Sequence, residues 1–383
     1  MTPLRIVVAH NRYRERGGED AVVDAEIALL RSYGHRVIEY RRDNAELDPR
    51  KRVGLLFQTL WSQSTARELS DVICNEGPDL IHVHNTFPLL SPSIYWASSR
   101  ARVPVVQTLH NFRLLCAQAT FLRKGELCED CLGRTPWRGV VRKCYRNSTS
   151  QSTALVAMLS VHRTLGTYRR KVTRYIALSE FSRAKFIEGG LPAQQISVKP
   201  NFVAAERSDA DERTGGVFVG RLSIEKGLHV LVAALRMLPH TVCDVIGAGA
   251  QLASVQNNAQ IRLLGEQSAQ AVLERMRTAS YLVMPSICYE QFPRTLVEAF
   301  ACGLPVIASR LGPLAELVTD GHTGLLFTPG SSSDLAEKLR FAETHPDTMR
   351  QMGRNARHEY EAKYTPQRNH EQLMEVYRAA MHC

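Results

Sequence analysis

The alternation of short apolar segments with amphipathic helical segments limits the fold of this chain more than any other feature of its sequence. Residues 4–9 form a continuous apolar, β-branched run, which is typical of a parallel strand buried on both faces. Gly17-Gly18 follows, and residues 21–33 then have the pattern of a helix that ends at Gly34-His35. The alternation continues, and we expect further strands at residues 36–40, 80–83, 105–109, 175–177 and 196–198.

A second series of the same kind begins after a charged break at residues 206–214. Here we expect strands at residues 216–219, 241–246, 260–264, 282–284 and 305–308, and a helix at residues 226–238. The two series predict an α/β fold with two doubly wound, Rossmann-like domains, at residues 1–200 and 201–364. Ligands of such sheets bind beyond the carboxyl ends of the strands, so we expect the site in a cleft between the domains.

The length and composition agree with two globular domains. The chain has 383 residues, of which 44% are hydrophobic and 22% charged, which is too long for one ordinary core. No segment approaches the ~20 apolar residues of a membrane span, and the N-terminal segment lacks the anatomy of a signal peptide. We therefore expect a cytoplasmic location, where the nine cysteines are not expected to form a disulfide framework.

The net charge of +10 is concentrated in the first half of the chain. Residues 1–200 contain 30 Lys/Arg against 18 Asp/Glu, and residues 201–383 contain 18 against 20. This excess indicates an anionic partner such as a membrane surface, a polyphosphate lipid or a nucleic acid. Residues 48–69 are predicted to form a helix with a basic start at Arg50-Lys51-Arg52. We interpret it as a packed helix with a solvated basic end, with contact to an anionic bilayer as the alternative.

Arg221 and Lys226 form the first candidate binding site. An apolar strand runs into Gly220, and a helix is expected to open near Lys226-Gly227. Two cations five residues apart, at a strand end and beside a helix N-terminus, suit a diphosphate because the helix N–H groups add to their charge. A surface arginine and lysine that flank a turn would have the same spacing, so on spacing alone this alternative stays open.

Glu290 and Glu298 form the second candidate site. Glu290 is expected in the loop after the strand at residues 282–284, and Glu298 in a helix that starts near Arg294-Thr295. Both carboxylates can therefore point into one cleft. A carboxylate can accept both hydrogen bonds of a ribose diol, and the helix start at Thr295-Leu296 offers N–H groups to a phosphate.

Together with their flanking segments, these residues make the chain resemble the retaining glycosyltransferases of family 4, which have the GT-B fold. The resemblance covers nearly the whole chain and is densest at residues 216–328. It implies two Rossmann-like domains facing a central cleft, the first binding the acceptor and the second the nucleotide sugar. It also implies that residues 365–383 form a helix that crosses back to the first domain. The matching segments are Gly220-Arg221-Leu222, Glu225-Lys226-Gly227, Glu290 and Glu298 with seven residues between them, and residues 301–308 and 320–326.

The resemblance implies a role for each candidate residue. Arg221 and Lys226 would neutralise the donor diphosphate in place of a catalytic metal ion, since fixed cations stabilise developing charge without reorganisation. Glu298 would hold the nucleotide ribose, whereas Glu290 and His110 would face the donor sugar. The other donor contacts would come from Gly17, Gly18, Gly249, Leu264, Thr295 and Leu296.

Three further features stand outside these roles. His82 and His84 flank Val83 in an expected strand, and we assign both to structural packing, with an approach of His84 and Asn85 to the cleft as the alternative. Residues 291–294 (Gln-Phe-Pro-Arg) depart from the family, which commonly has glycines after the first glutamate. Because they would touch the donor sugar, they bear on its identity more than on the reaction. Residues 209–211 (Asp-Ala-Asp) imitate the metal motif of other transferases but lie in the charged break, and we interpret them as a linker.

Cys116, Cys128, Cys131 and Cys144 are the second strong signal in the sequence. A Cys-x2-Cys pair with a flanking cysteine on each side has the ligand spacing of a structural zinc site, and Arg123-Lys124-Gly125 predicts a turn between the arms. Four thiolates would fill every position around the metal, so such a site would be structural. Zinc is our leading interpretation, and the alternatives are an iron–sulfur cluster, redox disulfides or four reduced cysteines.

The resemblance therefore implies a retaining hexosyl- or related glycosyltransferase of EC class 2.4, acting in cell-surface polysaccharide biosynthesis. It would use a nucleotide-diphosphate sugar and a glycan or polyprenyl-linked acceptor, at the inner face of the plasma membrane. A phosphorylase of similar fold would need a lysine site for pyridoxal phosphate, which the sequence does not reveal. A zinc-dependent nucleic-acid-binding protein would leave the cleft motifs unexplained, so nucleic acid is disfavoured as a partner.

Overall fold

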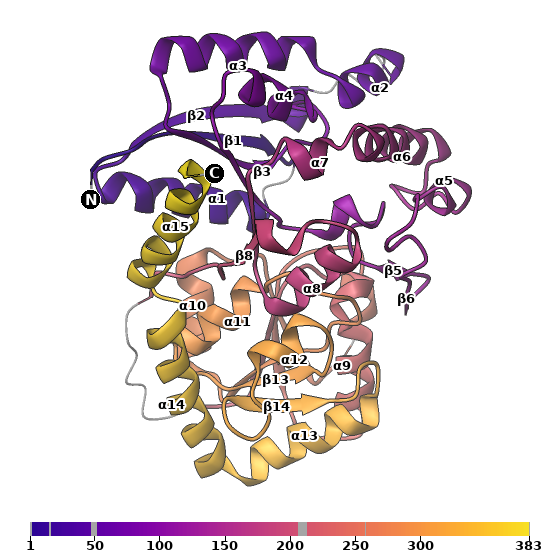
Figure 1. Ribbon diagram of the computed structural model, residues 1–383. Helices are drawn as coiled ribbons and strands as arrows, with labels where there is room; N and C mark the ends of the chain where they lie inside the picture. The colour runs from indigo at the N-terminus through magenta and orange to yellow at the C-terminus, as the bar shows by residue number, and fades with distance from the viewer. Residues whose placement is uncertain (1, 15–16, 47–51, 206–212, 257, 383) are drawn as a thin grey trace. The chain divides into compact units, whose positions relative to one another are not determined.

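The computed structural model describes residues 2–14, 17–46, 52–205, 213–256 and 258–382. The chain divides into two compact units (Figure 1). The first unit contains Met1–Thr120, Glu129–Pro200 and Asn369–Cys383, and the second contains Phe121–Cys128 and Asn201–Arg368. The predicted linker motif at residues 209–211 and the basic residues 50 and 51 lie outside the described residues.

The first unit is built on a parallel sheet, which has six strands among the described residues, in the order β2-β1-β3-β4-β7-β8. Its strands are β1 (Arg5–Arg12), β2 (Arg36–Asp43), β3 (Leu80–Asn85), β4 (Val105–Thr108), β7 (Arg174–Ala177) and β8 (Ile196–Val198). Its helices are α1 (Gly18–Ser32), α2 (Arg52–Leu60), α3 (Gln63–Glu76), α4 (Ser93–Arg100), α5 (Arg138–Val141), α6 (Thr149–Thr164), α7 (Thr167–Arg170) and α8 (Glu180–Glu188).

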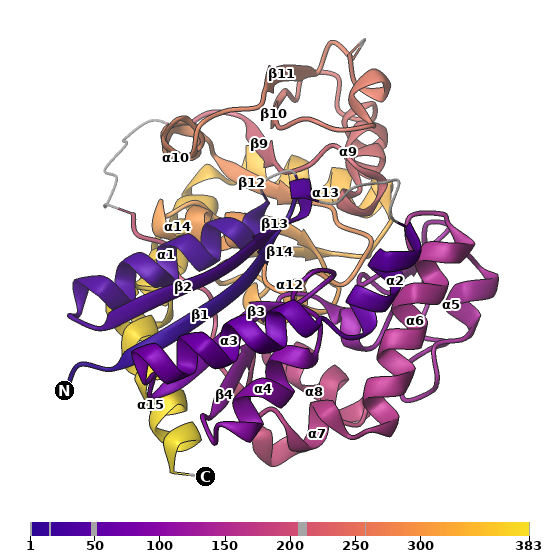
Figure 2. The same cartoon turned by 90° about the horizontal axis from the view of Figure 1, so that it is seen from above.

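Helices cover both faces of this sheet. Figure 1 shows α3 and α4 on one side of β1 and β2, and α1 together with α15 (Pro366–Met381) on the other. Figure 2 shows α3 and α4 side by side, in agreement with their direct contact. Between these layers β1 and β3 are buried along nearly their whole length, as their apolar sequences predict. The edge strand β2, which carries several charged residues, is only partly buried.

The second unit has the same architecture. Within the described part of the chain its parallel sheet has six strands, in the order β11-β10-β9-β12-β13-β14. The strands are β9 (Gly216–Val219), β10 (Cys243–Ile246), β11 (Ile261–Gly265), β12 (Tyr281–Met284), β13 (Val306–Ser309) and β14 (Gly324–Phe327). The helices are α9 (Leu228–Leu235), α10 (Ala269–Thr278), α11 (Arg294–Ala301), α12 (Pro313–Leu317), α13 (Ser332–Thr344) and α14 (Pro346–Lys363). A hairpin of β5 (Leu122–Arg123) and β6 (Glu126–Leu127) also belongs to this unit.

The local sequence explains why helix α1 follows strand β1. Ile6 and Val7 are fully buried, and α1 then begins at a capping box in which the Asp20 carboxylate accepts from the Gly17 N–H at 2.9 Å. The side chains that α1 turns toward the sheet include Val23 and Ile27. A carboxylate in the first turn also matches the positive end of the helix dipole.

The prediction of two parallel α/β sheets is confirmed, with three local differences. One helix was predicted at residues 48–69, but its described part, from Arg52 onward, contains α2 and the start of α3, which Ser62 caps by accepting from the Thr65 N–H at 3.3 Å. Strand β14 was not predicted. The loop at residues 116–144 was assigned wholly to the first domain, but Phe121–Cys128 belongs to the second unit. There the buried Phe121 ring packs edge-on against Tyr289.

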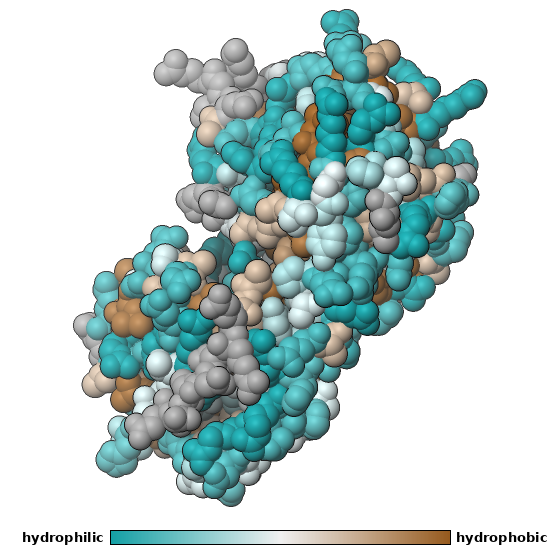
Figure 3. All heavy atoms as spheres, turned by 90° about the vertical axis from the view of Figure 1, so that its left-hand side faces the viewer, coloured by the Kyte–Doolittle hydropathy of each residue, from teal (hydrophilic) through white to brown (hydrophobic). Residues whose placement is uncertain are grey.

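The C-terminal segment also divides differently from the predicted boundary at residue 365. Residues up to Arg368 belong to the second unit, and Asn369 begins the return to the first. Asn369 Nδ2 donates to the Pro200 carbonyl at 2.6 Å. Hydrophilic side chains cover most of the face that Figure 3 shows, and none of the described helices is long and apolar enough to cross a membrane.

Candidate active site

Each sheet has a point at which its strand order reverses, and the predicted site residues gather there. In the first sheet the chain passes from β1 to β2 on one side and to β3 on the other. In the second sheet it passes from β9 to β10 and β11 on one side and to β12 on the other. The loops after strands at such points leave a crevice for ligands. His110 follows β4, beside β3, and Arg221 and Glu290 follow β9 and β12.

Lys226 and Glu290 form a partly buried ion pair at the reversal point of the second sheet. Lys226 Nζ lies 2.7 Å from Glu290 Oε1, which also accepts from Ser286 Oγ at 2.7 Å. Burial alone would raise the pKa of Glu290, but the Lys226 ammonium and these hydrogen bonds bring it below its usual value. Burial would likewise lower the pKa of Lys226, which Glu290 instead raises. Both side chains are therefore charged at neutral pH.

Gly227 allows the two loops of this pair to approach. Its φ of 70° is left-handed, and an added Cβ would lie 1.8 Å from the Pro285 carbonyl oxygen. The approach is fixed by a backbone hydrogen bond of 3.0 Å from the Ile287 N–H to the Glu225 carbonyl. Because of this left-handed residue, the helix predicted at residues 226–238 is split into a 3-10 turn at Ile224–Lys226 and helix α9.

Arg221 and Glu298 lie in contrasting environments. The Arg221 side chain is 79% exposed and lies 3.7 Å from Glu225 Oε1, so it is accessible to an anion. Glu298 is buried in α11, where its Oε1 lies 2.9 Å from Arg294 Nε. Burial raises the pKa of Glu298 despite this arginine. The Glu298 carboxylate, which the family resemblance assigns to the nucleotide ribose, is therefore already paired with Arg294.

The other predicted donor contacts come from backbone positions. The Leu296 N–H donates to the Pro293 carbonyl at 3.1 Å, so a phosphate would have to share it, and Thr295 lies in the same first turn of α11. Gly249 has a φ of 152°, and a Cβ there would lie 2.5 Å from the Leu222 carbonyl oxygen. Gly249, after β10, thus lies beside the loop that carries Arg221. Leu264 lies near the end of β11, which pairs with β10.

His110 is in direct contact with His84 in the first unit. His110 Nε2 lies 2.8 Å from His84 Nδ1, and the two rings stack with centroids 5.1 Å apart. Burial lowers the pKa of His110 well below its usual value and, together with His82, lowers that of His84 to about 3. Both rings are therefore neutral at physiological pH. A small cavity of about 40 Å³ lies against them, also lined by Asn111 and Arg113.

A buried carboxylate, Glu26, lies behind the two histidines. Its Oε1 is 3.0 Å from His82 Nδ1 and 3.4 Å from His84 Nε2, and its Oε2 is 3.0 Å from Lys199 Nζ. Burial alone would raise the pKa of Glu26, but Lys199 and His82 hold it well below the usual value. Glu26, His82 and His84 have the donor atoms of a metal site. The Lys199 ammonium already supplies the positive charge, so we interpret the group as a hydrogen-bonded network.

This network determines which His110 nitrogen carries the proton. The Glu26 carboxylate favours a proton on His84 Nε2, the nitrogen that faces it, although 3.4 Å is longer than a well-formed hydrogen bond. His84 Nδ1 is then an acceptor, so His110 Nε2 donates to it. The remaining nitrogen, His110 Nδ1, presents a lone pair, which can accept a hydrogen bond from a hydroxyl group.

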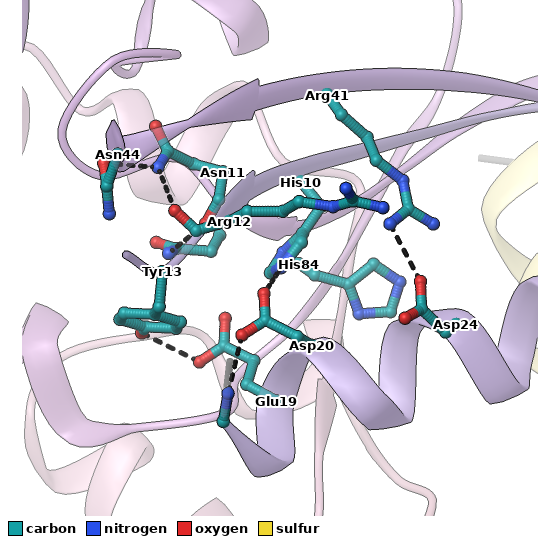
Figure 4. A network of polar contacts seen from close by, with 12 residues as sticks. His10, Asn11, Arg12, Tyr13, Glu19, Asp20, Asp24, Arg41, Asn44 and His84 are labelled. Atoms are coloured by element: carbon teal, nitrogen blue, oxygen red, sulfur yellow. Dashed lines mark hydrogen bonds and ion pairs between the residues drawn. The ribbon is translucent and has the colours of Figure 1, made fainter. Parts of the chain in front are cut away.

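The glycine pair lies beside acidic residues that the sequence did not single out. An added Cβ at Gly18 would meet nothing within 4 Å, so no neighbour in the chain requires a glycine there. Next to it, Tyr13 Oη donates to Glu19 Oε2 at 3.0 Å, and Asp20 Oδ1 lies 2.8 Å from His10 Nε2 (Figure 4). Burial raises the pKa of Glu19 from 4.5 to about 7, so a proton at this carboxyl is exchanged near neutral pH.

Replacing Glu19 by glutamine should remove a pH-dependent loss of stability. Because the unfolded carboxyl has its pKa near 4.5 and the folded one near 7, folding takes up a proton between these values. Stability therefore falls as the pH rises through this interval and is level above it. The difference in melting temperature between Glu19→Gln and the native protein should shift by several degrees in favour of the variant as the pH is raised from about 5 to about 8. A constant difference would contradict the raised pKa.

The four cysteines lie in and around the β5–β6 hairpin. The predicted turn is confirmed, with Lys124 and Gly125 both at positive φ, as a two-residue hairpin requires. The Cys128 N–H donates to the Phe121 carbonyl at 2.7 Å. Cys116 is buried, whereas Cys128, Cys131 and Cys144 are partly exposed.

Two parallel sheets with polar side chains at their reversal points define a two-domain α/β protein of the Rossmann-like class. The chain belongs to Glycosyltransferase Family 4, which matches residues 16–207, just over half of its length. Residues 205–359 match the family of group 1 glycosyl transferases.

Curated relatives and solved structures agree with this assignment. An uncharacterized glycosyltransferase of Methanocaldococcus jannaschii is 34% identical over 156 residues, covering 39% of this chain and 44% of that protein. The D-inositol 3-phosphate glycosyltransferase of Streptomyces bingchenggensis is 26% identical over 308 residues, covering 74% and 63%. The chain thus spans less than two thirds of either relative. The structure of Anabaena Alr3699/HepE in complex with UDP-glucose is similar, with a TM-score of 0.71 and 19% identity over 98% of this chain and 100% of that one.

Proposed function

We propose that this protein transfers a sugar from a nucleotide-diphosphate sugar to a glycan or lipid-linked acceptor, with retention of the anomeric configuration. The observation that carries the proposal is the Lys226–Glu290 ion pair, with Arg221 beside it, at the reversal point of the second sheet. Solved structures of similar fold hold UDP-glucose or UDP, and a partial relative is named phosphatidyl-myo-inositol mannosyltransferase. These names support a nucleotide-sugar donor and a lipid-linked acceptor.

In this proposal the cations stabilise the leaving group. Cleavage of a glycosyl–phosphate bond places negative charge on the departing diphosphate, and Lys226 and Arg221 neutralise it without a catalytic metal ion. Glu290 stays ionised because Lys226 lies beside it, so it can stabilise positive charge at the sugar but cannot act as a general acid. Glu298 exchanges its Arg294 partner for the ribose diol. His110 accepts a sugar hydroxyl at its Nδ1.

The first unit would bind the acceptor in cell-surface polysaccharide biosynthesis. Its excess of positive charge suits a phosphorylated lipid carrier at the inner face of the plasma membrane. We also propose that Cys116, Cys128, Cys131 and Cys144 bind one structural zinc ion. Four thiolates around zinc carry a net charge of about −2, which offsets part of the positive charge of the segment at residues 116–144.

Metal analysis of the purified protein tests the zinc proposal. We expect about one zinc ion per chain, lost in the Cys128→Ser and Cys131→Ser variants, because each removes one of four ligands. Cys74→Ser, at an exposed cysteine of α3, is the matched control and should keep its zinc. Iron in place of zinc would favour an iron–sulfur cluster, and the absence of both metals would contradict the proposal of a metal site.

A thermal-shift screen of nucleotide-diphosphate sugars, followed by glycan analysis of the product, tests the proposed reaction. One donor should raise the melting temperature of the native protein and be consumed with a membrane or glycan acceptor. Glu298→Gln should weaken the response to the donor and to the free nucleotide diphosphate alike, whereas Glu337→Gln, at an exposed carboxyl of α13, should not. If no nucleotide sugar binds or is consumed, the proposed function is wrong.

A further inference from the structure

A basic groove lies at the amino ends of three neighbouring strands of the first sheet. A hollow of about 670 Å³ is formed by the loops that precede β4, β7 and β8 and by the end of α15. A second hollow of about 410 Å³ shares Arg170, Gln194 and Gln195 with it, so the two form one continuous surface. We call this surface the amino-edge groove.

The described residues that line the amino-edge groove include several cations. Among the described residues, neither hollow is lined by an aspartate or glutamate. Lys171 is fixed there, since its Nζ donates to Ser99 Oγ at 3.0 Å and lies 4.8 Å from the centre of the Trp96 ring. Arg169 and Arg170 are exposed. Like charges that share a hollow repel one another, and an anion relieves the repulsion. The lining cations are Arg102, Arg163, Arg169, Arg170, Lys171 and Arg174.

Arg102 occupies a backbone position that favours glycine. It follows α4 with a φ of 57°. Its N–H donates to the Ser99 carbonyl and the Val103 N–H to the Ser98 carbonyl, which is the hydrogen-bond pattern of a Schellman motif. Glycine is preferred at the left-handed residue of this motif because a Cβ there costs on the order of 1 kcal/mol. The backbone therefore does not explain the arginine, whereas a role for its side chain does.

The amino-edge groove is distinct from the candidate active site of this unit. His110 follows the carboxyl end of β4, whereas Val103 and Pro104 precede its amino end. A strand of this length separates the two edges by roughly 13 Å. Since the transfer site of such a sheet lies at the carboxyl edge, the groove is not part of it.

We propose that the amino-edge groove binds a ligand with more than one phosphoryl group. Arginine is the preferred partner of phosphate, because its planar fork donates two parallel hydrogen bonds, and five of the six lining cations are arginines. The ligand can come from a phospholipid surface or from a soluble polyphosphorylated molecule. The inference is independent of the proposed transfer reaction.

The variant Arg102→Gly/Arg170→Gln tests this proposal without loss of fold. Glycine suits the backbone at residue 102, and Arg170 is exposed, so melting should not worsen. Binding should be measured with sodium tripolyphosphate by calorimetry, and with phosphatidylglycerol vesicles against phosphatidylcholine vesicles by co-sedimentation. Two lost cations should weaken binding about thirtyfold. The matched control is Arg67→Gln/Lys143→Gln, which removes the same charge from exposed positions of this unit outside the groove.

The two assays separate the sources of the ligand. Loss of tripolyphosphate binding alone supports a soluble ligand, and loss of phosphatidylglycerol binding supports a lipid headgroup. Equal losses in the control variant would show a general charge effect and overturn the site. Unchanged binding in the groove variant would overturn it as well, as would binding of a nucleic acid but of neither probe.

Discussion

Replacing Lys226 or Arg221 by alanine should lower the rate of sugar transfer about 100- to 1,000-fold, the usual effect of removing one preorganised group that stabilises developing charge. The two variants differ in a useful way. Arg221 is 79% exposed, so its removal should leave the melting temperature unchanged, and a lost rate would then report on chemistry. Lys226→Ala should also destabilise the second unit, because the partly buried Glu290 carboxylate would remain without its cation.

The comparison with Lys226→Ala/Glu290→Gln separates these effects. The second substitution removes the unpaired charge and should restore stability but not activity. Lys338→Ala, at a partly exposed lysine of α13, is the control for loss of a positive charge. A transfer rate within a factor of about three of the native rate in Arg221→Ala and Lys226→Ala would contradict the diphosphate role of both residues.

Replacing Lys199 by methionine should destabilise the first unit by about 3–5 kcal/mol, because an ion pair broken from one side leaves a buried charge uncompensated. Lys199 is 1% exposed and contacts both Glu26 and Asn369. In a unit of this size the loss corresponds to roughly ten degrees in melting temperature. Thermal unfolding followed by near-ultraviolet circular dichroism measures it.

The pH dependence of the Lys199→Met variant gives a second readout. Burial raises the pKa of Glu26, and the Lys199 ammonium is the largest influence that lowers it. Without Lys199 the Glu26 carboxyl therefore takes up a proton more readily in mild acid, which removes the uncompensated charge. The variant should therefore be least impaired in mild acid and most impaired above pH 7. In the double variant Lys199→Met/Glu26→Gln much of the stability should return. A single-variant loss below about 1 kcal/mol would show that Lys199 does not balance Glu26.

Local sequence patterns were sufficient to predict both sheets, but not the contacts between distant segments. All strands of the two sheets except β14 could be read from their apolar runs, and Lys226 and Glu290 were each placed after one of these strands. The ion pair between them was not predicted. Glu26 and Lys199 are 173 residues apart, so no local pattern joins them. Glu26 does lie three residues after Val23 and four before Leu30, on the apolar stripe of α1. That position signals a buried carboxylate.

The assignment of His84 to packing overlooked a second signal. Residues two apart on a strand share a face, so His82 and His84 had to point the same way. Their joint partner lies on α1, which the strand pattern does not reveal. The helix at residues 48–69 was predicted as one because its apolar stripe continues past Ser62, whose hydroxyl favours a cap over the helix interior.

Because α15 returns to the first unit, this unit is synthesised first but receives its last residues only after the second unit has been made. Asn369 and Tyr377 supply polar contacts to Lys199 and His82. The ribosome releases these residues only after it has made the whole second unit. Until then the nascent first unit contains the buried Lys199–Glu26 pair and His82 without Asn369 and Tyr377, although domains commonly fold in the order of their synthesis. The unit made first is therefore the unit completed last.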